Sequence, residues 1–272
     1  MRKLAVSIAA AALGFVPPAV AQTLVYSTGF EQGYVPGPLS GQGGWTVVNI
    51  SSGADESSDV VVQGAYAYAG DQAVEFTQPV GSTAAYHTFT PFIPAGPITV
   101  SARINYQFDA IDSQFLVDSA PGSEDITAGI AFLGTGGLAG GPVELVAFSS
   151  QTTEPEIGVV LGEFAATTWL DVSMTLNYAT QTYDVSVNGS QVGSNIAFCG
   201  VAVFDNDCTA ASVTPFSEID FRPHGPKSGV LYLDDVSVTE VPEPGAWSLM
   251  IAGVGLVGAS LRWRRARRFR PV

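Results

Sequence analysis

The sequence predicts an all-β protein, an antiparallel two-sheet sandwich of the jelly-roll type, and three observations carry this prediction. Apolar and polar residues alternate with a period of two in many short runs, which is the pattern of strands with one face in a core. Gly, Pro, Asn and Ser separate these runs, and no amphipathic helix of useful length interrupts residues 22–240. A domain of about 220 residues is large enough for one core between two packed sheets.

The clearest strand is expected over residues 98–108, in which every second residue from Ile98 onward is apolar. A second is expected over 170–178, turning at 179–182 and returning over 183–187 as a hairpin. Asn188-Gly189 then supplies the positive-φ pair of a tight turn into a further short strand. The remaining predicted strands are the apolar runs 24–27, 45–50, 60–63, 73–77, 85–90, 129–133, 143–148, 157–161, 216–221 and 230–239.

The first 21 residues are predicted to be a secretory signal. Arg2 and Lys3 form a basic start, an apolar stretch follows, and Ala19 and Ala21 place small residues before a cleavage site. We therefore expect this segment to direct export through the inner membrane and to be removed from the sandwich domain, residues 22–240.

Residues 241–272 combine three features in a fixed order. Pro242-Glu243-Pro244 keeps the chain extended, because proline cannot continue a helix upstream. Residues 246–261 carry no charge and, as a helix, would span about 24 Å, just short of a bilayer core. Trp247 and Trp263 are expected at the two membrane interfaces. Arginines after the apolar run predict a cytoplasmic C-terminus; they are Arg262, Arg264, Arg265, Arg267, Arg268 and Arg270.

This order of features resembles the sorting signal of the PEP-CTERM proteins of Gram-negative bacteria. The resemblance implies an exosortase, a membrane-embedded cysteine protease-like enzyme, that cuts at or near Pro242-Glu243-Pro244. It also implies transient anchoring in the inner membrane, followed by delivery to the cell surface or extracellular matrix. A plain tail anchor is the alternative interpretation of the same residues.

The predicted domain is strongly acidic. Between the signal and the tail the basic residues are Arg103, Arg222 and Lys227, against every acidic residue of the chain except Glu243. Such a surface repels nucleic acid and anionic membranes, so neither is an expected partner. Acidic exported domains of this kind more often meet neutral glycans or cations.

The two cysteines of the chain, Cys199 and Cys208, lie close together in the sequence. In an oxidising compartment they are expected to form one local disulfide. A two-thiol metal site is the poorer interpretation, because His87 and His224 are both distant in sequence.

A second resemblance concerns the domain itself. Segments 29–33 and 41–45 near its start, 231–238 at its end, and the hairpin 169–189 look like parts of concanavalin A-like and carbohydrate-binding-module sandwiches. In many of these sandwiches, acids from the first and last strands hold a structural calcium. Carried over, the calcium ligands would be Glu31 and Asp235, completed by backbone carbonyls. The alternative is that Glu31 accepts turn amide hydrogen bonds and Asp235 is solvated.

Glu218-Ile219-Asp220-Phe221-Arg222 resembles the Glu-Ile-Asp-x-Glu strand of retaining glucanases on this fold. The period of two would place the carboxylates side by side, as double displacement requires. Arg222 stands where the third carboxylate belongs, and it cannot donate a proton at neutral pH. The sequence therefore predicts no enzyme, and an atypical or degenerate glycan hydrolase is the last alternative.

Tyr66 and Tyr68 in a predicted loop are candidates for stacking against sugar rings, although aromatic residues are more often part of a core. The predicted function is that of an exported, non-enzymatic surface or matrix protein associated with exopolysaccharide or biofilm. A lectin-like carbohydrate-binding module with a structural calcium is the alternative. A structural calcium is a candidate cofactor, and no other cofactor is predicted.

Overall fold

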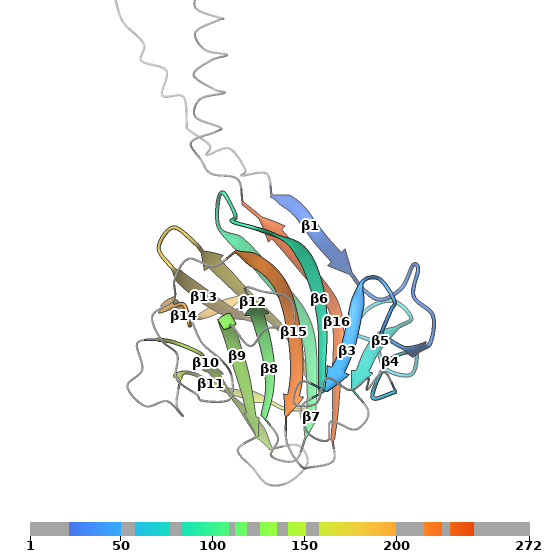
Figure 1. Cartoon of the computed structure of the whole chain (residues 1–272). Helices are drawn as coiled ribbons and strands as arrows, with labels where there is room; N and C mark the ends of the chain where they lie inside the picture. Colours follow the sequence, from blue (N-terminus) through green and yellow to red (C-terminus); the bar gives the residue numbers. More distant parts are fainter. Residues whose placement is uncertain are drawn as a thin grey trace, which may run out of the picture.

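A computed structural model describes residues 22–49, 58–76, 83–108, 112–118, 126–134, 141–150, 158–199, 215–224 and 229–241. These residues form two antiparallel sheets that pack face to face (Figure 1). The predicted two-sheet antiparallel sandwich is therefore confirmed. The predicted signal with Ala19 and Ala21, the tail from Pro242 onward, and Cys208 lie outside the described residues.

The larger sheet has nine strands and contains the strand that ends beside the sorting tail. Its strands, in order across the sheet, are β14 (Ser190–Ala197), β13 (Thr182–Val187), β12 (Trp169–Asn177), β7 (Ile98–Phe108), β16 (Gly229–Glu240), β5 (Ala73–Phe76), β4 (Val60–Gln63) and β2 (Gly37–Pro38). The ninth strand, β1 (Thr23–Thr28), pairs with the second half of β16.

The smaller sheet has seven strands. In order they are β11 (Val159–Ala165), β10 (Pro142–Ala147), β9 (Ile126–Gly134), β8 (Asp112–Asp118), β15 (Phe216–His224), β6 (Thr83–Phe92) and β3 (Trp45–Asn49). Strands β8 to β11 follow one another along the chain and also lie side by side in the sheet. Strands β6 and β8 do not pair with each other, because β15 lies between them.

The core lies between the sheets and follows the predicted alternation. Every second residue of β12, from Leu170 to Leu176, is buried, while those between them are half-exposed. Each buried aliphatic side chain of this kind contributes about 1.5–3 kcal/mol. Tyr183 joins the sheets, because its hydroxyl donates to the carbonyl of Gly129 on β9 at 2.9 Å. Burial raises the pKa of Tyr183 well above its usual range.

The strand predictions for 98–108 and 60–63 are confirmed, and so is the hairpin after residue 178. Asn188 and Gly189 have φ angles of 51° and 75°, as the predicted tight turn requires. The prediction missed β8, since Phe115, Leu116 and Val117 are all buried and the strand shows no alternation.

No helix long and apolar enough to cross a membrane occurs in the part of the chain that the structure describes. The membrane helix expected over 246–261 lies outside that part, together with Trp247, Trp263 and the six terminal arginines. The anchor and its orientation therefore stay predictions.

Candidate glycan-binding surface and acidic clusters

Four aromatic side chains gather on the outer face of the nine-stranded sheet, and we call this group the aromatic surface: Tyr66, Tyr68, Trp169 and Tyr232. The Tyr66 ring is stacked on Trp169, with centroids 5.6 Å apart and planes 13° apart. The centroid of the Tyr232 ring lies 4.7 Å from that of Tyr66. The centroid of the Tyr68 ring lies 5.8 Å from that of Trp169. Tyr66 is 36% exposed and Tyr68 44%. The two tyrosines singled out in the sequence thus lie together at the surface.

The register of strand pairing brings two of these rings to the same part of the sheet. Trp169 on β12 and Tyr232 on β16 are both Cα partners of Asn105 on the central strand β7. Asn105 is fully buried, and its amide Nδ2 donates to the Tyr66 hydroxyl at 3.1 Å. Tyr66 is therefore held over the sheet by a hydrogen bond as well as by stacking. Sequence reasoning missed Trp169, Tyr232 and Asn105, because their meeting depends on non-local strand pairing.

Arg103 borders the aromatic surface. Its guanidinium lies 4.4 Å from the centroid of the Tyr68 ring, a cation–π contact. It also forms an ion pair with Asp171, with Nη1 3.1 Å from Oδ2. Because Asp171 balances its charge, Arg103 fixes Tyr68 without making the surface strongly basic.

Two carboxylates anchor the loop between β4 and β5 that presents Tyr66 and Tyr68. Asp234, fully buried, accepts hydrogen bonds from the amides of Tyr68 at 3.0 Å and Ala69 at 3.2 Å. Glu31 accepts from the amides of Asp71 at 2.7 Å and Gln72 at 2.8 Å. Desolvation by burial raises the pKa of Asp234, and the amide hydrogen bonds oppose that shift. The loop is thus fixed at two points by acids from distant segments.

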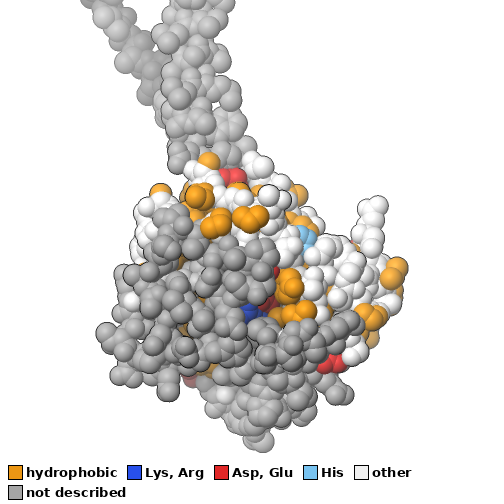
Figure 2. Space-filling model, in the orientation of Figure 1, with side chains coloured by type: hydrophobic (Ala, Val, Ile, Leu, Met, Phe, Trp, Pro, Cys, Tyr) orange, Lys and Arg blue, Asp and Glu red, His pale blue; other side chains and the backbone are white. Residues whose placement is uncertain are grey.

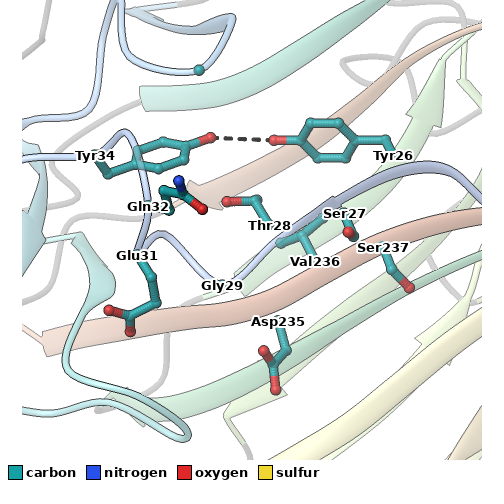
Figure 3. Close-up of a pocket in the computed structure, with 11 residues that line it drawn as sticks. Tyr26, Ser27, Thr28, Gly29, Glu31, Gln32, Tyr34, Asp235, Val236 and Ser237 are labelled. Atoms are coloured by element: carbon teal, nitrogen blue, oxygen red, sulfur yellow. Dashed lines mark hydrogen bonds between the residues drawn. The ribbon is translucent and has the colours of Figure 1, made fainter.

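Glu31 and Asp235, the two expected calcium ligands, line one open groove of about 750 Å³ (Figure 3). Gly29 lies between them, so close that a Cβ there would be 3.2 Å from Asp235 Oδ1. Asp235 has a φ of 46° where the pairing of β16 with β7 shifts register. Tyr26 and Tyr34 face each other across the groove, with hydroxyls 3.4 Å apart. The structure therefore brings the two predicted residues together.

Calcium requires six to eight oxygen ligands, and the groove offers few. One oxygen of Glu31 already accepts two amide hydrogen bonds, which is the alternative role stated for this residue. Asp235 is exposed. The described residues contain one group of three side chains whose possible metal-ligand atoms all lie within 4.8 Å of one another. This group is Asp118, Glu218 and Asp220, and it does not include Glu31 or Asp235. Glu31 and Asp235 thus fit a calcium shell incompletely, and calcium binding there stays a proposal.

We expect Asp234→Asn to destabilise the protein by about 1–3 kcal/mol. The two carboxylate oxygens of Asp234 accept hydrogen bonds from three backbone amides, and asparagine replaces one of these oxygens with an NH2 group, which cannot accept them. Urea unfolding measures the loss, and hydrogen exchange at the Tyr68 and Ala69 amides locates it. Asp235→Asn is the matched control, since that side chain is exposed; it should change stability by less than about 0.5 kcal/mol.

Equal losses in the two variants would contradict the anchoring role of Asp234. The same unfolding curves with added calcium or EDTA test the proposed ion. A calcium-dependent gain in stability that Glu31→Gln removes would support a bound ion, whereas curves that calcium and EDTA leave unchanged would contradict it.

An acid–arginine cluster lies on the other sheet: Asp118, Glu218, Asp220 and Arg222. The three residues of β15 alternate with the core residues Ile219 and Phe221, so they share the strand's opposite face. Asp118 on β8 is the Cα partner of Glu218. Arg222 Nη2 lies 2.7 Å from Asp118 Oδ2, and Arg222 Nε donates to Asp220. All four side chains are buried.

The cluster places three carboxylates beside one guanidinium. Burial raises the pKa of Asp220, and Arg222 opposes the shift. Burial lowers the pKa of Arg222, but Asp220 and Asp118 outweigh that effect and the net shift is upward. Arg222 thus forms ion pairs with a residue of its own strand, Asp220, and with Asp118 of β8. Asp118 was missed because β8 shows no period-two pattern.

Cys199 is buried just after β14, and its amide donates to Thr127 of β9 at 3.0 Å. No cysteine among the described residues is a free thiol. Cys208, the predicted partner, lies outside the described residues, so this pairing stays a prediction.

Residues 240–266 match the family model described as the PEP-CTERM protein-sorting motif. The chain carries a PEP-CTERM sorting motif. The resemblance stated for the tail is thereby confirmed, and the motif indicates export and C-terminal processing. No curated protein matches the sequence itself.

Several solved structures are similar to this chain, and the titles of the three that follow name two glucanases and a xylan-binding domain. An endo-1,3-β-glucanase from Streptomyces sioyaensis has 14% identity and a TM-score of 0.53, covering 83% of this chain and 99% of that one. SCLam, a non-specific endo-β-1,3(4)-glucanase of family GH16, has 12% identity and a TM-score of 0.51, covering 82% and 93%. The CBM22-1 xylan-binding domain of Paenibacillus barcinonensis Xyn10C has 15% identity and a TM-score of 0.41, covering 83% and 99%. At these identities the likeness concerns the fold alone.

Proposed function

We propose that this protein is an exosortase substrate that is released to the cell surface or matrix, where its sandwich binds a neutral polysaccharide without cleaving it. The observation that carries the proposal is the aromatic surface, with Tyr66 and Tyr68 exposed and stacked around Trp169. The sorting motif supports the extracellular destination, because it marks the chain for export.

Sugar binding follows from the physical character of this surface. The apolar faces of pyranose rings pack on flat aromatic rings, and hydroxyls such as that of Tyr66 supply hydrogen bonds at the edge. Exposed groups of large apolar side chains on an otherwise polar protein mark binding sites. Among the described residues, the cation beside this surface is Arg103, which is paired with Asp171. The domain as a whole is acidic, and both features disfavour anionic polymers.

The acid–arginine cluster is the observation that favours the alternative, a glycan hydrolase. It occupies the strand whose sequence resembles that of retaining glucanases, and two structural neighbours are endoglucanases by title. A retaining enzyme needs one carboxylate as nucleophile and another as proton donor. Here Arg222 holds Asp220 and Asp118 in ion pairs. This pairing favours a structural role for the cluster, and we propose that the protein is not an enzyme.

Binding of the full-length protein to an array of neutral and acidic polysaccharides tests the proposal. We expect binding to one or more neutral glycans, lost on Tyr66→Ala and retained on Tyr86→Ala. Tyr86 is the matched control, a half-buried tyrosine on β6 of the other sheet. Binding to no glycan would contradict the proposal. So would release of reducing sugar from a β-glucan that Glu218→Gln abolishes.

A further inference from the structure

The sorting motif begins inside the folded domain. Its first matched residue, Glu240, is the last residue of β16 and pairs with Thr23 of β1 on one side and Ile98 of β7 on the other. The next amide, that of Val241, donates to the carbonyl of Pro97 at 2.8 Å. The described fold therefore continues up to Val241, the residue directly before Pro242.

Glu240 also links the motif to a neighbouring turn. Its Oε1 accepts hydrogen bonds from the amides of Ala95 at 2.7 Å and Gly96 at 3.4 Å, in the turn between β6 and β7. The side chain that opens the motif thus fixes this turn against the end of β16.

The chain between the fold and the apolar run is short. From Val241 to Ala246 an extended chain reaches at most about 18 Å. An enzyme that grips Pro242-Glu243-Pro244 in an extended form therefore works within contact distance of the end of the sandwich. The surface at that end must either accommodate the enzyme or obstruct it.

This end of the sandwich is apolar and nearly free of charge, and we call it the end face. It comprises residues 22–25, 91–98, 177–181 and 239–241, in which Glu240 is the only charged side chain. Ile93 is 62% exposed and Leu24 61%. Figure 2 shows apolar side chains gathered at the upper end of the described part of the molecule. The rest of the domain, by contrast, carries a large excess of acidic residues.

A groove of about 400 Å³ crosses the end face between the β6–β7 and β12–β13 turns. Ile93 and Pro97 line one side, and Asn177 and Tyr178 line the other.

We propose that the end face is the docking surface for the membrane-embedded processing enzyme that the sorting motif addresses. This inference rests on the proposed function as an exosortase substrate. The face meets an apolar protein surface rather than lipid headgroups, because the described part of it offers no basic side chain to anionic lipids. Docking there places Pro242 at the enzyme, since only Val241 separates that residue from β16.

The experiment compares processing of the full chain in producing cells, read as the fraction of precursor that loses the C-terminal tail. We expect the double variant Leu24→Asp/Ile93→Asp to lower that fraction at least five-fold, with signal removal, melting temperature and glycan binding unchanged. Val35→Asp is the matched control, because Val35 is 64% exposed and lies outside the end face. It should be processed like the wild type.

Four results separate the possibilities. If the wild type keeps its tail, the proposed function fails; if the wild type and the double variant are processed equally, only docking fails. Co-sedimentation of the tailless domain with phosphatidylcholine or phosphatidylglycerol vesicles, lost in the double variant, would assign the face to lipid and overturn the inference. A flexible spacer of eight residues after Val241 should slow processing, whereas faster processing would show that the domain only obstructs the enzyme.

Discussion

Replacing Trp169 by alanine should reduce affinity for the bound polysaccharide by at least 30-fold, equivalent to about 2 kcal/mol or more. The change removes the ring on which Tyr66 is stacked and against which the edge of Tyr68 packs. Both exposed rings then lose the support that fixes their orientation. Isothermal titration with the glycan identified on the array measures the effect.

Trp169→Phe is the companion variant, because it keeps a flat ring at the start of β12 and should lose less than about ten-fold. Circular dichroism and a melting curve show whether Trp169→Ala remains folded. If folded Trp169→Ala binds as tightly as the wild type, the aromatic surface is not the binding site. The groove that contains Tyr26 and Tyr34 would then be the next candidate.

Replacing Arg222 by methionine should destabilise the protein by about 3–5 kcal/mol at pH 7, because buried carboxylates lose their cation. Arg222 pairs with Asp118 and Asp220, and all three side chains are buried. Arg103→Met is the matched control, since its ion pair with Asp171 is partly exposed; we expect a loss of about 0–1 kcal/mol. Urea unfolding measures both changes.

The loss on Arg222→Met should shrink as the pH falls from 7 to 4. Burial already raises the pKa of Asp220 in the presence of Arg222, and removing the guanidinium raises it further. A carboxyl whose pKa is higher in the folded than in the unfolded protein favours folding at low pH, and that contribution is lost as the pH rises. An equal loss at both pH values would contradict this account, as would a loss under about 1 kcal/mol at pH 7.

The strands that the sequence predicts best are those with one face in the core. Residues 98–108 and 170–178 alternate because one side of each strand meets the opposite sheet and the other does not. β8 shows the limit of this reasoning, since a strand buried on both faces has no period of two. Missing β8 also meant missing Asp118 and hence the full acid–arginine cluster.

The candidate binding site was predictable only in part, for a related reason. Tyr66 and Tyr68 stand out as closely spaced aromatic residues in a loop, a local signal. Trp169 and Tyr232 look like ordinary strand residues, and their contact with Tyr66 exists because β12, β7 and β16 are neighbours. The same holds for Asp234, whose bonds to the Tyr68 and Ala69 amides join residues far apart in the chain.

The sequence by itself determined the strand character of the domain, its acidity and the sorting motif at its end. Each of these is a property of composition, of spacing along the chain, or of a contiguous pattern. Only the tertiary structure decided which aromatic rings share a surface, which carboxylates hold loops or pair with Arg222, and that the fold runs up to Pro242. These depend on strand order and register, which non-local packing between the two sheets selects and local sequence does not encode.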